Sequence, residues 1–491
     1  MNFIRTTPEE AGISSKRILE FLKTLNDAGF CTHDIIMARG EKIFCECYYE
    51  PFNRDFLHRM YSVSKSFVAV AIGMAIDDGL INIDDKIADY FGEYINDKTS
   101  EGVRSLKIRD MLTMHTGMSD HINWFTSGTQ DRCSLYFGNY EYTVSGTVFY
   151  YDSSASFLMG ALVEKVTKKP LIDYMRDKAL RDIGFSEKAY CLKAPGGHSF
   201  GDSAVMCSAE DLLRFARFVM NKGEWNGRQY VSRKYMEEAV KKQVCNSNSG
   251  FIGYSGYGYG YQIWKAPDDG FAFVGMGDQF AICDPTTDFI FIINSDNQGN
   301  GSTRPILYHE LYKEIIHKFG KPLAEDKAAY NELCDFVSNQ KLFAFDKGVD
   351  TDFAGVINNK VYELEENKMG IEYIKLCFEG EKGELHYKNK QGEKTLVFGM
   401  GYNEFSKFPE EGYSDMVATE FAKGNYYDCA CSAGWAETKK LRIKVQIIDK
   451  YFGNGCFVFS FKDDRVTVLM TKTAENFMNE YSGVAMGRLK E

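Results

Sequence analysis

The residues Ser62-Val63-Ser64-Lys65 could supply a nucleophile and its base. On a helix, Ser62 and Lys65 would lie three residues apart on the same face. A serine hydroxyl attacks well once a base takes its proton, and a lysine whose pKa is lowered by burial or nearby cations can be that base. A serine at a helix start also has a free backbone N–H for an oxyanion. The alternative is a helix-capping serine with a surface lysine, which the tetrapeptide alone favours because so short a motif often arises by chance.

The segment that follows the tetrapeptide argues against a surface position. Residues 67–75 (FVAVAIGMA) are almost purely apolar and small. A helix of this composition must be buried on nearly all sides, which would also bury Lys65. A buried lysine needs a reason, and activation of Ser62 supplies one. Ser64 is then expected to be a supporting hydroxyl.

A second group of candidate residues lies in TVFYYDSSASFLMGALVEKVTKKPLIDYM, at 147–175. Here a loop with Tyr150 and Tyr151 leads into an apolar helix. A tyrosine beside an ammonium group can have a lowered pKa and can act as general base and acid. Taken in isolation, both tyrosines are better explained as packing aromatics. Between the two groups lies IRDMLTMHTGMSD, and we expect His115 to have a structural role near its helix end.

The elements that must position these residues fall into three regions. A chain of 491 residues is long enough for two or three domains. Up to about residue 60, the pattern predicts one helix and then two strands joined by a turn at 39–41. The middle, to about residue 250, is mostly helical. Strands then return, and a helix near 304–319 closes this domain.

The C-terminal third has a different residue pattern. Strand follows strand, and Leu441, Ile443, Val445 and Ile447 alternate with polar residues at a period of two. These patterns predict three segments. They are a domain of helices and strands at 1–322, which holds the candidate residues, a helical connector at 323–340, and a separate β-rich domain at 341–491.

Composition and charge exclude several classes of function. A net charge of -11 argues against nucleic-acid or anionic-membrane partners. The 13 cysteines have no regular spacing, which favours reduced thiols. The chain shows no secretory signal at its start and no apolar run of membrane-spanning length, so we expect a cytoplasmic protein with no membrane partner. The histidines have no metal-ligating spacing, so no metal or cofactor is expected. A homo-oligomer is possible.

Together these motifs resemble the penicillin-recognising serine hydrolases of the class C β-lactamase type. That group includes D-alanyl-D-alanine carboxypeptidases, β-lactamase-like carboxylesterases and 6-aminohexanoate-dimer hydrolases. Six motifs match in order over about residues 5–320, among them YSVSKSF, LTMHTGM and FYYDSSASFLMGALVEKVT. The residues after 341 resemble the barrel-like appendage of some members. The resemblance implies an α+β fold, with an antiparallel sheet flanked by helices and a helical subdomain.

The resemblance also implies roles for individual residues. Ser62 would be the acylated nucleophile, Lys65 its base, and Tyr151 the tyrosine that shares the proton transfers. The triplet 273–275 (FVG) stands where the family has K-T-G or H-x-G. The N–H of Met276, just after the triplet, would therefore join that of Ser62 in the oxyanion hole.

Two departures from the family pattern bear on the substrate. Ser153 stands where the family has the Asn of its Y-x-N motif, and Phe273 stands where the triplet has Lys or His. By this resemblance Ser153, Phe273 and Gly275 would line the substrate site. Loss of the cation favours an uncharged substrate over a β-lactam or D-Ala-D-Ala stem.

We therefore expect a serine hydrolase that acts through an acyl-enzyme on a small-molecule ester, an amide or a peptide-like substrate. The alternatives are a β-lactamase or D-Ala-D-Ala carboxypeptidase. In another class, the chain would be a non-catalytic sensor or binding protein with the same fold.

Overall fold

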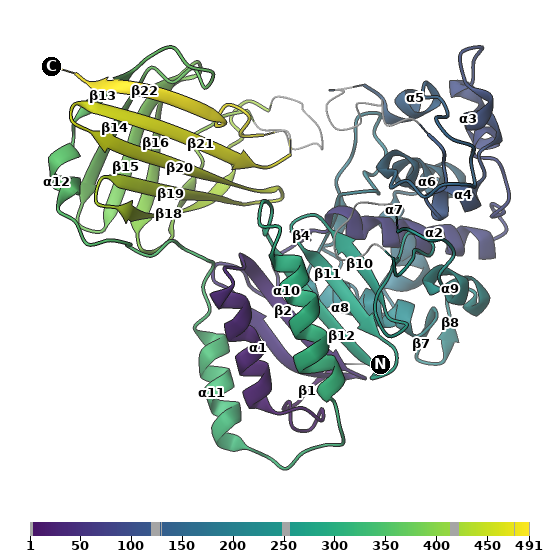
Figure 1. Cartoon of the computed structure of the whole chain (residues 1–491). Coiled ribbons are helices and arrows are strands. Elements are labelled where there is room, and N and C mark those ends of the chain that lie inside the picture. The colour runs from purple at the N-terminus through teal and green to yellow at the C-terminus, as the bar shows by residue number, and fades with distance from the viewer. Residues whose placement is uncertain are drawn as a thin grey trace. The chain divides into compact units, whose positions relative to one another are not determined.

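The computed structural model describes residues 3–118, 128, 130–247, 256–412, 422–475 and 477–490 (Figure 1). The chain divides into two compact units between Lys341 and Leu342. The first unit combines helices with an antiparallel sheet, and the second is a closed β-barrel. The predicted α+β class with a separate β-rich C-terminal domain is therefore confirmed.

The main sheet of the first unit has seven strands, and all neighbours are antiparallel except β1 and β3. Helix α1 (Ser15–Asp27), helix α10 (Thr303–Glu310) and the π-helical turn η5 (Leu311–Ile315) pack on one face, and helix α8 (Ala209–Met220) packs on the other. In order across the sheet the strands are β1 (Ile4–Arg5), β3 (Lys42–Tyr48), β2 (Thr32–Arg39), β12 (Phe289–Ser295), β11 (Gln279–Asp284), β10 (Phe271–Gly275) and β9 (Trp264–Lys265).

Because both faces of the sheet are covered, its central strands are apolar throughout rather than alternating. Every residue of β10, β11 and β12 is buried. Within β10 successive side chains still point to opposite faces. Ala272 and Val274 join the core under α1 and α10, while Phe273 contacts Phe215 of α8.

The helical part of the first unit is built around α2 (Ser64–Asp77). Every residue from Ser64 to Ala75 is buried, as the composition of this helix predicts. It packs against α6 (Ser153–Thr167), α7 (Leu171–Met175) and α9 (Arg233–Val240). Helix α11 (Lys327–Ser338), in the segment predicted as a connector, packs on α1 and β3 within this unit.

Shorter elements complete the first unit. They are helices α3 (Glu101–Ser105), α4 (Ile108–Leu112) and α5 (Arg132–Phe137), strands β4 (His58–Arg59), β5 (Tyr190–Cys191), β6 (Val205–Cys207), β7 (Glu224–Trp225) and β8 (Arg228–Gln229), the 3-10 turns η1 (Tyr61–Val63), η2 (Ile87–Tyr90), η3 (Gly92–Tyr94) and η6 (Ile316–Lys318), and the π-helical turn η4 (Arg176–Leu180).

The second unit is a ten-stranded sheet that closes through parallel pairing of β16 with β18. The period-two apolar residues of β19 are all buried, so they fill the barrel interior. A short helix, α12 (Phe353–Ile357), precedes the barrel. The strands are β13 (Val361–Leu364), β14 (Tyr373–Glu379), β15 (Lys382–Asn389), β16 (Gly392–Met400), β17 (Glu404–Lys407), β18 (Asp428–Glu437), β19 (Lys440–Ile448), β20 (Phe452–Lys462), β21 (Arg465–Thr473) and β22 (Gly483–Leu489).

A buried carboxylate, Glu410, joins several elements of the barrel. Lys394 forms an ion pair with it at 3.3 Å, and the side chains of both residues are almost inaccessible to water. Asn389 donates to Glu410 Oε1 at 2.7 Å, and the hydroxyl of Tyr481 donates to the same oxygen. This network fixes the segment around Glu410 against β15, β16 and the chain before β22.

We predict that Lys394→Met lowers the local stability of the barrel by about 3 kcal/mol, because it leaves the Glu410 carboxylate buried without its cation. Hydrogen exchange of the full-length chain, read on peptides from β15 and β16, should then be faster by on the order of 100-fold. Lys382→Met is the matched control, since it breaks an exposed pair with Glu404 and should cost less than about 1 kcal/mol. Equal effects of the two substitutions would contradict the prediction.

Candidate active site

The segment that carries Ser62 is a strained turn held by buried contacts. Ser62 lies in η1, which leads directly into α2, and its side chain is partly exposed. The preceding residue, Tyr61, has a φ of 44°, a left-handed conformation that is rare for a bulky residue. The Arg59 guanidinium lies 4.3 Å from the centroid of the Tyr61 ring, and its Nε donates to the Ser203 carbonyl at 2.9 Å. Such strain persists only where the surroundings enforce it, and it is common at functional sites.

Lys65 is brought within hydrogen-bond reach of Ser62. Its Nζ donates to Ser62 Oγ at 3.0 Å and to the carbonyl oxygen of Asp202 at 2.7 Å. The Lys65 side chain is fully enclosed, with 1% of the residue exposed. The two residues predicted as nucleophile and base thus meet inside the first unit, and a backbone carbonyl fixes the amine.

Tyr151 lies close to the Lys65 amine. The Lys65 Nζ is 5.1 Å from the centroid of the Tyr151 ring. That ring stacks on Trp264 of β9, with centroids 5.5 Å apart and planes at 27°. Tyr150 is 48% exposed. The structure therefore places Tyr151, rather than Tyr150, beside the lysine.

The residues after Tyr151 anchor the start of α6. Asp152 caps the helix by accepting from the Ala155 N–H at 3.1 Å, and its second oxygen accepts from the Thr116 hydroxyl at 2.9 Å. Ser153 is the first residue of α6 and is partly buried. The loop that holds Tyr151 is thus tied both to its own helix and to the turn after α4.

The end of β10 lies against the turn that carries Ser62. A Cβ placed on Gly275 would lie 2.5 Å from the Met60 carbonyl oxygen, so only glycine permits this close approach. Met276 follows directly, and Gln279 donates to its carbonyl oxygen at 3.0 Å. The strand end that contains the predicted oxyanion donor is therefore adjacent to η1.

Phe273 faces the core of the first unit. Its ring is fully buried and lies 5.4 Å from that of Phe215 and 5.9 Å from that of Phe271, measured between centroids. A fully buried ring offers no surface to a substrate. The sequence placed Phe273 at the substrate site, whereas the pleat of β10 turns its side chain toward α8.

Two further residues singled out in the sequence have structural contacts. The Oγ of Ser64 accepts from the backbone N–H of Val205 at 3.0 Å and so ties α2 to β6. Burial lowers the pKa of His115, whose Nδ1 lies 3.5 Å from the Thr113 hydroxyl.

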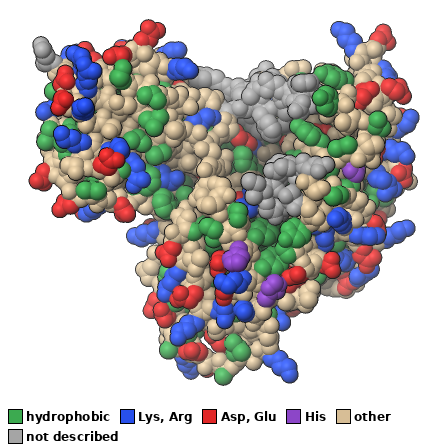
Figure 2. All heavy atoms as spheres, viewed as in Figure 1, with side chains coloured by type: hydrophobic (Ala, Val, Ile, Leu, Met, Phe, Trp, Pro, Cys, Tyr) green, Lys and Arg blue, Asp and Glu red, His purple; other side chains and the backbone are tan. Residues whose placement is uncertain are grey.

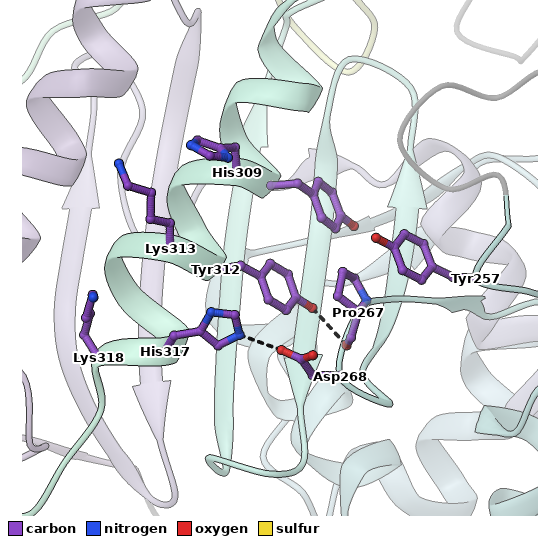
Figure 3. A pocket seen from close by; sticks show the side chains of 9 residues that line it. Tyr257, Pro267, Asp268, His309, Tyr312, Lys313, His317 and Lys318 are labelled. Carbon is purple, nitrogen blue, oxygen red and sulfur yellow. Dashed lines mark hydrogen bonds and ion pairs between the residues drawn. The ribbon is translucent and has the colours of Figure 1, made fainter.

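A surface hollow of about 650 Å³ lies elsewhere on the first unit, between α10, the turns after it and the β9–β10 connection. The Tyr312 hydroxyl lies 3.4 Å from the Pro267 carbonyl, and His317 lies 2.6 Å from Asp268. Figure 3 shows that the labelled His309 points away from these groups. Figure 2 shows hydrophobic side chains gathered beside histidines in the region of α10. None of the predicted site residues lines this hollow, so it is not the candidate active site.

Comparisons with known proteins assign the family. A model described as Beta-lactamase matches residues 35–311, more than half of the chain. The chain belongs to the Beta-lactamase family. A 6-aminohexanoate-dimer hydrolase from Paenarthrobacter ureafaciens is 23% identical to this member over 284 residues, which are 53% of this chain and 72% of the relative.

Solved structures show the same fold at low identity. One, provisionally named a 6-aminohexanoate-dimer hydrolase from Bacillus anthracis, matches with a TM-score of 0.54 and 17% identity, over 65% of this chain and 87% of that one. A family VIII carboxylesterase matches with a TM-score of 0.51 and 14% identity, over 64% and 99% of the two chains. The predicted resemblance to the β-lactamase-like group is therefore confirmed.

The described part of the chain has no group of three or more His, Cys, Asp and Glu residues placed to hold a metal ion. Over the same residues, no helix has the length and apolar character needed to cross a membrane.

Sequence reasoning missed several contacts of this family member. The Asp202 carbonyl that holds Lys65 is a backbone atom, and Trp264 lies in GYGYGYQIW, in the region where strands are expected to return. An aromatic residue in that motif was the available signal, but its packing on Tyr151 depends on tertiary structure.

A pair of buried titratable groups joins the short strand before Ser62 to the main sheet. His58 of β4 and Asp34 of β2 approach to 3.4 Å, and both side chains are almost completely inaccessible to water. Burial raises the pKa of Asp34 to about 7, although Asn294 donates to its carboxyl, and burial lowers the pKa of His58 to about 3. Burial also lowers the pKa of the neighbouring His33. Between about pH 4 and pH 6.5 the fold therefore favours the uncharged forms of Asp34 and His58.

The two residues change the free energy of unfolding with pH in opposite directions, because in the unfolded chain their pKa values are about 4 for Asp and about 6.5 for His. Asp34 stabilises the fold at low pH, and this stabilisation is lost as the pH rises from about 4 to about 7. His58 stabilises the fold above about pH 6.5, and this stabilisation is lost as the pH falls toward 3.

We predict that Asp34→Asn makes the free energy of unfolding fall more steeply than in the wild type as the pH drops from 7 to about 4. His58→Phe should make the same fall shallower, because it removes the titration of His58. His33 is present in the wild type and in both variants, so it does not alter the comparison. Urea unfolding at a series of pH values measures these slopes. Parallel curves for the two variants would contradict the assignment of uncharged groups.

Proposed function

We propose that this member of the Beta-lactamase family is a serine hydrolase that cleaves an uncharged ester or amide through an acyl-enzyme. The observation that carries the proposal is the contact of the fully buried Lys65 amine with the Ser62 hydroxyl at 3.0 Å. A buried amine beside a partly exposed serine hydroxyl suits nucleophile activation better than helix capping. The names of two relatives, an amide-type dimer hydrolase and a carboxylesterase, agree with this reaction class.

In the proposed first half-reaction, Ser62 Oγ attacks the substrate carbonyl carbon while its proton passes to Lys65 and Tyr151. The backbone N–H groups of Ser62 and Met276 stabilise the oxyanion. The C–O or C–N bond of the substrate then breaks. The leaving alcohol or amine takes up the proton that Ser62 gave, and the acyl group remains on Ser62 Oγ.

In the second half-reaction, water replaces the leaving group. Tyr151, with Lys65 beside it, accepts a proton from the water as it attacks the acyl carbon, and the ester bond to Ser62 breaks. The proton returns to Ser62 Oγ and the acid leaves. Neither half-reaction needs a metal or another cofactor.

The preference for an uncharged substrate follows from the triplet at 273–275. The family places a cation where this chain has Phe273, and that ring is buried against Phe215. The motif therefore offers no charge to a substrate carboxylate. Ser153, at the first position of α6, supplies a shorter hydroxyl in place of the usual amide for the acyl-side carbonyl.

We predict that Ser62→Ala lowers turnover of p-nitrophenyl acetate to the uncatalysed background, because no other hydroxyl takes its place. The measurement is steady-state release of p-nitrophenol by the full-length chain. Ser105→Ala, which changes an exposed serine of α3, is the control and should keep wild-type activity. Activity retained in Ser62→Ala would refute the assignment of the nucleophile.

Three assays separate the alternatives. Nitrocefin turnover faster than ester turnover would favour a β-lactamase, and release of D-alanine from a D-Ala-D-Ala peptide would favour a carboxypeptidase. A fluorophosphonate probe, read by intact mass, tests for a reactive serine. Absence of an adduct in the wild type would favour the non-catalytic binding protein.

We also predict that Gly275→Ala lowers kcat by about 10- to 100-fold, because the added Cβ would push the end of β10 away from Met60 and misplace the Met276 N–H. Gly355→Ala is the matched control, since a Cβ there meets nothing within 4 Å. The two proteins should be compared for p-nitrophenyl acetate turnover after their folded content has been checked by circular dichroism. Equal kcat values would exclude a role for this strand end in catalysis.

A further inference from the structure

Gln262 is a buried polar residue in an unusual backbone conformation. It lies in the tight turn that joins Tyr259 to Trp264, where the two residues form a bridge. Its φ is 55°, and only 2% of the residue is exposed. The left-handed conformation is costly for a residue such as Gln, so its surroundings must compensate. The compensation comes from hydrogen bonds made by both its backbone and its side chain.

Two serine hydroxyls reach Gln262 from the helices that carry the candidate catalytic residues. Ser66, the residue after Lys65 on α2, donates to the Gln262 carbonyl at 2.9 Å. Ser156, in the first turn of α6, donates to Gln262 Oε1 at 2.6 Å. Both serines are buried. A single residue therefore ties the helix of Lys65 to the helix that begins just after Tyr151.

Gln262 also bonds the end of α4. Its backbone N–H donates to the Leu112 carbonyl at 2.9 Å, and its Nε2 donates to the Met111 carbonyl at 2.8 Å. The chain then continues to Met114, whose carbonyl accepts from the Tyr150 N–H at 2.9 Å. The loop before Tyr151 is thus connected to Gln262 through α4 as well as through α6.

The turn that holds Gln262 also places the aromatic partner of Tyr151. Trp264, two residues after Gln262, stacks on the Tyr151 ring at 5.5 Å. The hydrogen bonds of Gln262 join α2, which carries Lys65, to α6 and α4, which flank the loop of Tyr151. A buried network in which each member is bonded is rigid, whereas loss of one member leaves a buried group unsatisfied.

We propose that Gln262 is a positioning residue that sets the separation of the Lys65 amine and the Tyr151 phenol. The proposal rests on the proposed function, because it concerns the groups that would transfer the proton of Ser62. Proton transfer is sensitive to such distances, and a misplacement of about 1 Å can cost on the order of 100-fold in rate. We expect little change in substrate affinity, since none of the predicted substrate-lining residues belongs to this network.

The test uses substitutions small enough to leave the fold intact. Ser66→Ala should release α2 from Gln262, and Ser156→Ala should release α6. Each should lower kcat for p-nitrophenyl acetate by about 10- to 100-fold and leave KM within about threefold. The rate of labelling of Ser62 by a fluorophosphonate should fall by the same factor as kcat. Gln262→Met, which removes both side-chain bonds, should lose at least as much activity as either serine variant.

Tyr235→Phe is the matched control. It also removes one buried hydroxyl that donates to a backbone carbonyl, that of Ala69, which lies on α2 itself, at 2.7 Å. It should lower the thermal unfolding midpoint as much as Ser66→Ala does, while kcat stays at the wild-type value. A general loosening of α2 would instead lower kcat equally in both variants, and that result would overturn the proposal.

Wild-type kcat in both Ser66→Ala and Ser156→Ala would overturn the positioning role even if Ser62→Ala were inactive. Activity in Ser62→Ala would instead refute the proposed function itself. The two failures are therefore distinguishable. The serine variants decide the question even if Gln262→Met does not fold.

Discussion

The candidate site depends on keeping one amine, the Nζ of Lys65, enclosed and hydrogen-bonded. An amine away from water is costly unless protein groups replace its hydration. Here the Ser62 hydroxyl and the Asp202 carbonyl do so. The start of α2 and the segment at 202–205 bond each other in both directions. Lys65 donates to the Asp202 carbonyl, and the Val205 N–H donates to the Ser64 hydroxyl. The start of α2 and the segment at 202–205 therefore hold each other, and the lysine geometry follows from that contact.

Close backbone approach is the condition for this contact. A Cβ on Gly201 would lie 2.8 Å from Val68 of α2, and one on Gly160 of α6 would lie 3.7 Å from the Gly201 backbone. Gly201 thus lets α2 and the segment before Asp202 approach closely, whereas a Cβ at Gly160 would make only ordinary contacts. A side chain at position 201 would press on Val68 and displace the segment that supplies the Asp202 carbonyl to Lys65. The packing of the helical part and the chemistry of the site therefore share one constraint.

Much of this could be predicted from the sequence because it depends on local pattern. The apolar run after Lys65 indicates burial of α2, and the spacing of Ser62 and Lys65 indicates their contact. Other features depend on tertiary structure. The Asp202 carbonyl is a backbone group, so residue type gives no sign of its role. Gln262 stands in a strand-like motif, yet a left-handed turn makes it a bonded centre. The strand pattern gives no sign of this turn or of the two serines that donate to Gln262 there.

Phe273 shows how the loss of a family residue can have a structural consequence of its own. Its ring packs on Phe215 of α8, and Phe215 stacks on Phe67 of α2 with centroids 3.7 Å apart. An aromatic column therefore runs from the strand of the predicted oxyanion donor to the helix of Lys65. A lysine at this position would have to place its charge within that column, where no water can solvate it. Replacing the cation by phenylalanine removes a charge for the substrate and joins β10 to α2 through dispersion and burial. The aromatic contacts thereby fix the position of β10 relative to α2, which carries Lys65.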